Sequence, residues 1–192
     1  MTRKFYRSML SFVIGWFLLT GIAFAATTPS SLENQIHREL VKLPYYSMFD
    51  NVTFELNGSS VTLTGEVWWP ALKKSMERVV GKVEGITGVD NQITVLPTSF
   101  RDDDLRLATA RALFSDSALN KYVWSGVSFG LLPYRSDIHI IVKNGNVTLE
   151  GVVLRQSDSD IASLRAKGCV RGLLGHQQPT RAKLRRGLTL LK

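Results

Sequence analysis

The stretch Val61-Thr62-Leu63-Thr64-Gly65-Glu66-Val67 decides the fold, because a close copy of it occurs later in the chain. The copy is Val147-Thr148-Leu149-Glu150-Gly151-Val152-Val153, 86 residues further on. In both copies apolar and polar residues alternate, which is the pattern of a strand with one buried face. Asn57-Gly58 precedes the first copy and Asn144-Gly145 the second, and Asn-Gly favours a hairpin turn. Each copy is therefore predicted to be the second strand of a hairpin, in a chain of two related modules.

The residues around the first copy predict an α-β-β-α-β order. Apolar residues at helical spacing begin at about Leu32, and residues 51–56 alternate as the first strand of the hairpin. After the copy, Pro70 favours the start of a helix, and Gly85 ends its apolar stripe. Residues 89–96 then read as a third strand.

The second copy has the same surroundings only in part. A helix is predicted from Leu105 to about Tyr122, followed by a strand over 138–142 and, after the copy, by another helix. After Gly168 no alternating strand is recognised where the first module has its third. The second module is therefore predicted to lack its last strand.

The first 25 residues have the order of a secretory signal peptide. Arg3, Lys4 and Arg7 precede an apolar run from Met9 to Ile22, and Ala23-Phe24-Ala25 provides a small-residue cleavage site. The run is short for a membrane span, which needs about 20 residues. Export to the periplasm with cleavage is therefore favoured over an uncleaved anchor, which stays open as the alternative.

The formal charge of +8 comes from the two ends of the chain. Three basic residues lie in the first 25 positions and eight lie from Arg165 to Lys192, whereas residues 26–164 hold 13 basic and 16 acidic residues. This balance argues against a basic nucleic-acid binder. The single cysteine, Cys169, excludes an internal disulfide framework.

With this order of elements and this repeated strand, the chain resembles the BON (bacterial OsmY and nodulation) domain family, in its tandem periplasmic form. The matching residues are Val61–Val67, Arg78-Val79-Val80, Gly88-Val89-Asp90-Asn91-Gln92-Ile93 and Asn144–Val153, and the resemblance covers about Leu32 to Gly168. It implies an α+β fold in which each module is a small mixed sheet with two helices on one face. It also implies an envelope location and a non-catalytic role linked to phospholipid contact or envelope maintenance. The expected boundaries are 1–25 for the signal peptide, 30–97 for the first domain, 102–168 for the truncated second domain and 169–192 for a basic tail.

Motifs for chemistry are scarce, and we expect no enzyme activity, no cofactor and no metal. His37, His139 and His176 share no ligand spacing. We interpret Asp102-Asp103-Asp104 as residues that stabilise the positive end of a helix dipole. A cation site is less favoured, because three consecutive carboxylates in a helix do not converge on one point. Gly85-Ile86-Thr87-Gly88 has the form of a nucleic-acid clamp, but it lacks a flanking basic pair and reads as a turn. A hydrolase remains only a formal alternative, since no acid, base and nucleophile can be named together.

Large apolar side chains gather at Trp68-Trp69 and in the loop from Tyr122 to Arg135, which we call the aromatic loop. Both places suit a membrane interface, where aromatic rings lie at headgroup level. The alternative is that they pack one module against the other or fill the open face of the sheet. The candidate residues for contact with a membrane or a partner are Trp68, Trp69, Trp124, Phe129, Leu131, Leu132 and Tyr134.

Two functions follow as expectations. The first is an exported, non-enzymatic protein that binds anionic phospholipid surfaces or envelope proteins, in envelope maintenance or osmotic stress protection. The second is a soluble periplasmic module with a chaperone-like or protein-interaction role and no lipid binding. Nucleic acid and small-molecule substrates are not expected as partners, and the sequence leaves the oligomeric state open.

The tail from Cys169 to Lys192 breaks with the rest of the chain, because it is basic and shows no recognised pattern. If the codons for residues 169–181 are read one base later, the genetic code permits Val-Ser-Gly-Val-Phe-Ser-Val-Thr-Asn-Asn-Leu-Arg. The Val-Thr-Asn-Asn-Leu of that reading falls at positions 175 to 179, where the repeat requires a strand. The tail is therefore predicted to be out of frame and disordered.

Overall fold

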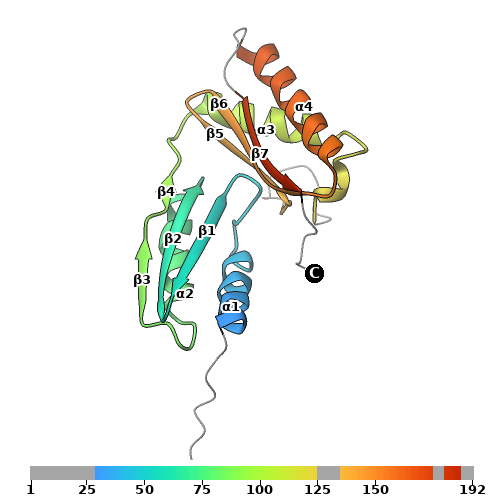
Figure 1. Ribbon diagram of the computed structural model, residues 1–192. Helices are drawn as coiled ribbons and strands as arrows, with labels where there is room; N and C mark the ends of the chain where they lie inside the picture. Colours follow the sequence, from blue (N-terminus) through green and yellow to red (C-terminus); the bar gives the residue numbers. More distant parts are fainter. Residues whose placement is uncertain (1–28, 125–134, 175–179, 187–192) are drawn as a thin grey trace, which may run out of the picture.

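A computed structural model of the chain, which describes residues 29–124, 135–174 and 180–186, consists of two modules in tandem (Figure 1). The elements of the first module are α1 (Pro29–Val41), β1 (Asn51–Asn57), β2 (Ser60–Val67), α2 (Pro70–Val80), β3 (Gly88–Asn91) and β4 (Thr94–Val95). Those of the second are α3 (Phe100–Phe114), the 3-10 helix η1 (Asn120–Tyr122), β5 (Ile138–Lys143), β6 (Asn146–Val153), α4 (Gln156–Leu174) and β7 (Thr180–Arg186). The predicted α+β fold of two tandem modules is confirmed.

In the first module, β2 is the central strand. It pairs with β1 in antiparallel register, and β3 and β4 pair with it in parallel. The strand predicted over 89–96 is interrupted because the Asn91 side chain intervenes: its Oδ1 accepts from the Ile93 amide at 3.2 Å and its Nδ2 donates to the Lys73 carbonyl at 2.9 Å. The Gln92 amide still donates to the Leu63 carbonyl, so the segment keeps its course along β2.

Both hairpins form as predicted, but their turns differ by one residue. In the second, Lys143 pairs with Asn146, and both central residues, Asn144 and Gly145, have positive φ (52° and 76°), as a type I′ turn requires. In the first, Asn57 is still paired, with Ser60. Its central residues are Gly58 and Ser59, of which only Gly58 has a positive φ, as in a type II′ turn.

Gly65 and Gly151 occupy the same position in the two copies, and both are required there. Their φ values are 118° and 131°, a region that side-chain-bearing residues rarely adopt. A Cβ on Gly65 would lie 2.1 Å from the Asn51 carbonyl oxygen, and one on Gly151 would lie 1.9 Å from the Asp137 carbonyl oxygen. In each module the neighbouring strand begins so close to the glycine that no side chain fits.

The prediction that the second module lacks its last strand is wrong. β7 pairs with β6 in parallel along seven residues, from Val147 with Thr180 to Val153 with Arg186. The expected disorder is also wrong for residues 169–174 and 180–186, which belong to α4 and β7; the rest of the predicted tail lies outside the described residues. The sequence Thr-Arg-Ala-Lys-Leu-Arg-Arg does alternate, but only Leu184 is a large apolar residue, so the pattern reads as a solvated basic tail. Among the described residues, the second sheet nevertheless has three strands against four in the first.

The helix predicted from Leu105 to about Tyr122 is displaced. α3 begins at Phe100 because the Ser99 hydroxyl accepts from the Asp102 amide and caps the helix. It ends at Phe114, after which Asp116 accepts from the Ala118 amide at 2.9 Å and turns the chain toward η1.

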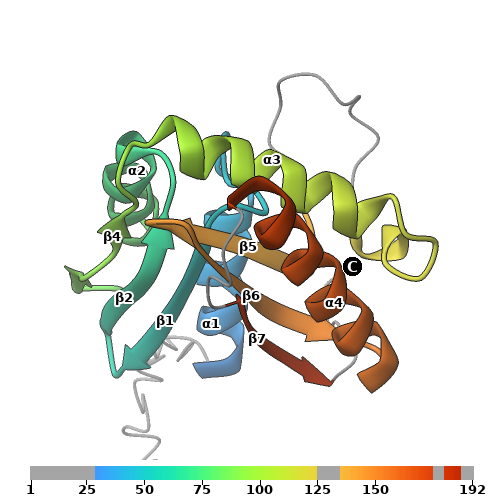
Figure 2. The same cartoon turned by 90° about the horizontal axis from the view of Figure 1, so that it is seen from above.

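Each module has its own hydrophobic core between its helices and one face of its sheet. In the first, α1 and α2 supply Ile36, Met76 and Val80 to that core, against Leu63 of β2. In the second, α3 and α4 cover the face of the sheet that carries Leu149. Figure 1 shows α3 and α4 above the sheet of β5, β6 and β7 and the first module below it, and Figure 2 views the same arrangement from above.

Candidate contact surfaces and the junction between the modules

The segment after α1 ties the first module to the second. Met48 (1% exposed) and Phe49 (5% exposed) belong to the core of the second module. The Met48 carbonyl accepts a hydrogen bond from the Ile140 amide at 2.6 Å, on the outer edge of β5. The junction is therefore both an apolar contact and an extension of the second sheet at its edge.

Asp50 fixes this segment from within. Its fully buried carboxylate accepts from the Trp68 amide at 2.7 Å and from the amide and hydroxyl of Ser47 at 2.9 and 2.7 Å. Burial raises the pKa of Asp50, while these hydrogen bonds act in the opposite direction. Burial, together with the Asp50 charge, also raises the pKa of Tyr46. These groups hold the end of β2 against the chain before β1.

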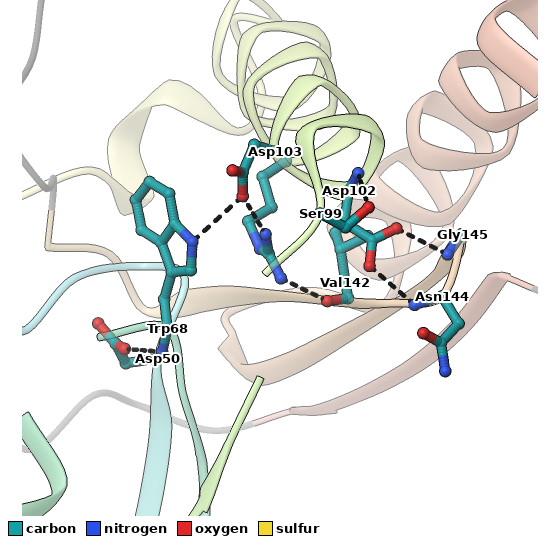
Figure 3. Close-up of polar contacts among 9 residues, drawn as sticks. Asp50, Trp68, Ser99, Asp102, Asp103, Val142, Asn144 and Gly145 are labelled. Atoms are coloured by element: carbon teal, nitrogen blue, oxygen red, sulfur yellow. Dashed lines mark hydrogen bonds and ion pairs between the residues drawn. The ribbon is translucent and has the colours of Figure 1, made fainter. Parts of the chain in front are cut away.

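Trp68, one of the candidate contact residues, lies in this junction. Its half-buried ring meets Phe49 edge to face, with 5.4 Å between ring centroids. Its Nε1 donates to the Asp103 carboxylate at 3.2 Å, as Figure 3 shows, and the Arg106 guanidinium lies 5.5 Å from its ring centroid. Trp68 therefore joins β2 to α3.

Arg106 is a fully buried cation at the same place. Its Nη2 donates to the Val142 carbonyl at 2.6 Å and its Nη1 pairs with Asp103. Burial lowers the pKa of Arg106, while Asp103 opposes that change. An arginine nevertheless stays charged at any physiological pH, so the group is a permanent buried charge whose two terminal nitrogens have partners and whose Nε has none among the described residues.

The three consecutive aspartates at the start of α3 have three different surroundings. Asp102 is buried, and its two oxygens accept from the Asn144 and Gly145 amides at 2.8 Å each (Figure 3). Asp103 binds Trp68 and Arg106, and Asp104 is exposed. Asp102 and Asp103 are thus structural, one holding the second hairpin turn and the other the junction. Among the described residues, no group of three His, Cys, Asp or Glu side chains is placed to hold a metal ion.

Trp69 and Trp124 remain open to contact, with 48% and 44% of each side chain exposed. Trp124 lies in the stem of the predicted aromatic loop, where its amide donates to the Arg135 carbonyl at 2.8 Å and its Nε1 to Asp137 at 2.8 Å. The remaining candidates lie outside the described residues: Phe129, Leu131, Leu132 and Tyr134.

The stem is anchored to α4 by a buried group. The Tyr122 hydroxyl donates to Asp158 and accepts from the Leu154 amide at 2.9 Å, and Lys121 pairs with Asp158 at 2.9 Å. Burial, then the bond to Asp158, raises the pKa of Tyr122. Burial alone would raise the pKa of Asp158, but the bonds from Lys121 and Tyr122 outweigh it and lower that pKa.

Two exposed apolar residues of α3 were missed in the sequence. Phe100 is 91% exposed and Leu107 is 45% exposed, and the two lie seven residues apart, on one side of α3. The opposite side of the helix is buried, with Leu105 and Leu113 in the core. The spacing of Phe100 and Leu107 was visible, but the helix was expected to begin only at Leu105.

The histidines described by the structure lie apart from one another. Burial lowers the pKa of His37 on α1. It also lowers the pKa of His139 on β5, whose ring centroid is 6.2 Å from that of Tyr46. His176 lies outside the described residues.

None of the described helices has both the length and the apolar composition to cross a membrane. No match was found among curated proteins. Among solved structures, the chain is similar to CdsD, a structural protein of the type III secretion system of Chlamydia trachomatis, at 12% identity over 80% of this chain and 90% of that chain, with a TM-score of 0.27. The C-terminal domain of CdsD is matched at 12% identity over 79% of this chain and 94% of that chain, with a TM-score of 0.26. TM-scores this low support no conclusion about the fold or function of this chain.

The family comparison is more informative. A family model, the BON domain, matches residues 30–97 and residues 115–173. The two matches together span more than half of the chain, each includes one copy of the repeated strand, and the second ends before β7. The chain belongs to the BON domain family, with two BON domains in tandem.

Proposed function

We propose that this chain is an exported, non-enzymatic BON-domain protein that binds phospholipid surfaces, with a role in envelope maintenance or osmotic stress protection. Membership of the family supports a lipid-linked envelope role. The order of charged, apolar and small residues in the first 25 positions supports export to the periplasm.

The observation that carries the proposal is the outer side of α3. Phe100 and Leu107 are exposed to solvent on one side of α3, and the other side of this helix packs in the core of the second module. Arg111 is also exposed and follows Leu107 by one helical turn, beside the apolar pair. Burying apolar side chains at an interface gains about 25 cal/mol per Å², and basic residues add attraction to anionic lipids. We name Phe100, Leu107 and Arg111 the α3 stripe.

The exposed tryptophans add to this surface chemistry. Trp69 and Trp124 each present an aromatic ring with a polar N–H, the type of side chain that favours the headgroup region. Phe129, Leu131, Leu132 and Tyr134 are proposed as further contacts from their composition alone.

Flotation with vesicles of phosphatidylglycerol and phosphatidylcholine tests the proposal at low and high salt. We expect the chain to float at low salt, Phe100→Ser to weaken this strongly, and Leu164→Ser to leave it unchanged. Leu164 is a matched control, because it is 71% exposed and lies on α4. Absence of flotation at low salt would overturn the proposal. If the chain instead suppresses aggregation of a client protein without lipid, the soluble chaperone-like alternative is favoured.

A further inference from the structure

The open face of the second sheet holds a polar pocket beside the first module. Its volume is about 340 Å³. The lining residues come from β2, β5, β6, β7 and the second hairpin turn: Glu66, Ile141, Lys143, Asn144, Asn146, Thr148 and Arg181. Ile141, Thr148 and Arg181 are paired across three adjacent strands and form one row of the pocket floor. Glu66 is the part of the wall that the first module supplies.

The charges in the pocket favour an anion. Lys143 and Arg181 are cations and Glu66 is the single carboxylate of the lining. Lys143 Nζ lies 3.5 Å from Glu66 Oε1, a loose pair with both side chains partly exposed. Arg181 has no hydrogen bond or ion pair within the part of the chain that the structure describes. Its guanidinium is therefore available for a ligand.

The remaining groups narrow the class of ligand. Guanidinium binds phosphate oxygens through two parallel hydrogen bonds, and the Thr148 hydroxyl lies in the same row. The Asn146 amide group donates to the carbonyls of Lys143 and Asn144 at 3.2 Å each, so its oxygen is left to accept. Ile141 gives an apolar floor for carbon atoms. The volume of the pocket is near the lower end of the range for small-molecule sites. It exceeds the volume of a phosphate ion alone.

We propose that this pocket binds a small soluble phosphate ester, with its phosphate on Arg181 and Lys143 and its alcohol carbons over Ile141. The site goes beyond the proposed membrane contact and does not depend on it. Ile141 and Thr148 of the pocket alternate with the core residues Val142 and Leu149, so the pocket lies on the face of the second sheet opposite the core. Figure 1 shows α3 on the core side of this sheet, and the α3 stripe lies on the side of α3 that faces away from the core. A bilayer bound by the α3 stripe therefore does not reach the pocket, and this geometry favours a free ester over a lipid headgroup.

Titration of the full chain with glycerol 3-phosphate, followed by isothermal calorimetry, tests the proposal. We expect saturable binding that Arg181→Gln weakens about tenfold or more. Glu66→Gln should strengthen binding by about threefold, because it removes the competing carboxylate and frees Lys143. The matched control Arg171→Gln makes the same change of charge at an exposed site of α4, behind the sheet, and should alter the affinity by less than about twofold.

Three results would overturn the proposal. The first is absence of saturable binding of glycerol 3-phosphate. The second is an equal loss in Arg171→Gln and Arg181→Gln, since this would show only long-range attraction. The third is a lack of any gain in affinity in Glu66→Gln. This variant is needed because Arg181→Gln could lose affinity merely by disturbing β7.

Vesicle flotation separates the two sources of phosphate. If Arg181→Gln floats as the unchanged chain does while losing glycerol 3-phosphate, the ligand is the soluble ester, as proposed. If Arg181→Gln loses flotation and the unchanged chain ignores the free ester, the pocket binds a headgroup and the proposal of a soluble ligand is wrong. Phe100→Ser should lose flotation and keep ester binding, so failure of either proposal is distinguishable from failure of the other.

Discussion

The two modules share a hairpin and differ in the strand that follows their second helix. In the first module Val61 pairs with Val89, and in the second the equivalent Val147 pairs with Thr180. The repeat would place that partner at position 175, so the strand comes five residues late. The delay coincides with a longer helix, since α4 has 19 residues and α2 has 11.

This difference separates two kinds of structural information. The hairpin is specified locally, by an alternating strand, a turn and a glycine that no other residue can replace. The parallel strand has no turn to fix its register, because a crossover helix connects it. Such a parallel strand can therefore form from a sequence with few apolar residues, provided that the residues on one of its faces can pack against the hydrophobic core. The second module shows this case, with Leu184 as the one large apolar residue of β7.

The largest expected effect is at the shared glycine. Gly65→Ala and Gly151→Ala should each destabilise the fold by about 3 kcal/mol or more, because a Cβ would meet a carbonyl oxygen at 2.1 or 1.9 Å and φ is positive. Urea unfolding measures the loss. Gly168→Ala on α4 is the control, since a Cβ there meets nothing within 4 Å. A loss below about 1 kcal/mol in either variant would mean that the hairpins do not approach as described.

The next effect is at the residue of the first module that corresponds to Leu184. Ile93, between β3 and β4, lies four residues after Val89, as Leu184 lies four residues after Thr180, and it is 1% exposed in the first core. Ile93→Ala should cost about 2–5 kcal/mol, from lost apolar burial and the cavity that remains. Urea unfolding measures it, and Thr94→Ala, at an exposed neighbour, is the control. A cost as small as that of Thr94→Ala would contradict the placement of Ile93 in the first core.

A smaller effect is expected at Asp102, which stabilises the second hairpin turn. Asp102→Asn should cost about 1–3 kcal/mol, since an amide cannot accept both backbone hydrogen bonds and Gly145 is buried. Asp104→Asn changes the same charge at an exposed position and should cost less than about 0.5 kcal/mol. Thermal unfolding of both variants measures the difference. Equal losses would show that helix-dipole attraction alone explains the aspartates.

Much of the fold could be predicted from the sequence, because the hairpins depend on neighbours in the chain. The alternation, the Asn-Gly pairs and the repeated glycine located β1, β2, β5 and β6, and the order of elements led to the family. The start of α3 was missed because Ser99 caps the helix before its apolar pattern begins. β7 was missed because a strand that meets the core is expected to be apolar, and in this strand basic residues alternate with Thr180, Ala182 and Leu184.

The junction and the candidate surfaces could not be predicted, because they depend on residues distant in the sequence. Nothing local shows that Asp102 binds amides 42 and 43 residues away. The same holds for Trp68, which looked like a contact residue and lies against Asp103 and Arg106. The pocket was also hidden, since Glu66, Lys143 and Arg181 meet only when both modules are assembled.

The late strand also bears on the reading frame. The family match ends at residue 173, before β7, and β7 lies five residues beyond the place where the alternative reading puts Val-Thr-Asn-Asn-Leu. The hypothesis that the codons after residue 168 are read out of frame stays a prediction. It excludes the proposed pocket, because the shifted frame does not encode Arg181. Sequencing the gene across the Cys169 codon tests it. Stop codons in the alternative frame, or no Val-x-Asn-Asn-Leu, would reject it.

The smallest expected effect is at Leu184 in β7. Its side chain is only half-buried against the second core, so Leu184→Ala should cost less than about 1 kcal/mol, well below Ile93→Ala. Urea unfolding compares the two, and hydrogen exchange should show β7 opening before β5 and β6, because edge strands with few apolar contacts open locally. A cost equal to that of Ile93→Ala would make β7 a fully integrated strand. In that case the second module is stable with β7 as its last strand, in the late register, and a shifted reading frame is not needed to complete its sheet.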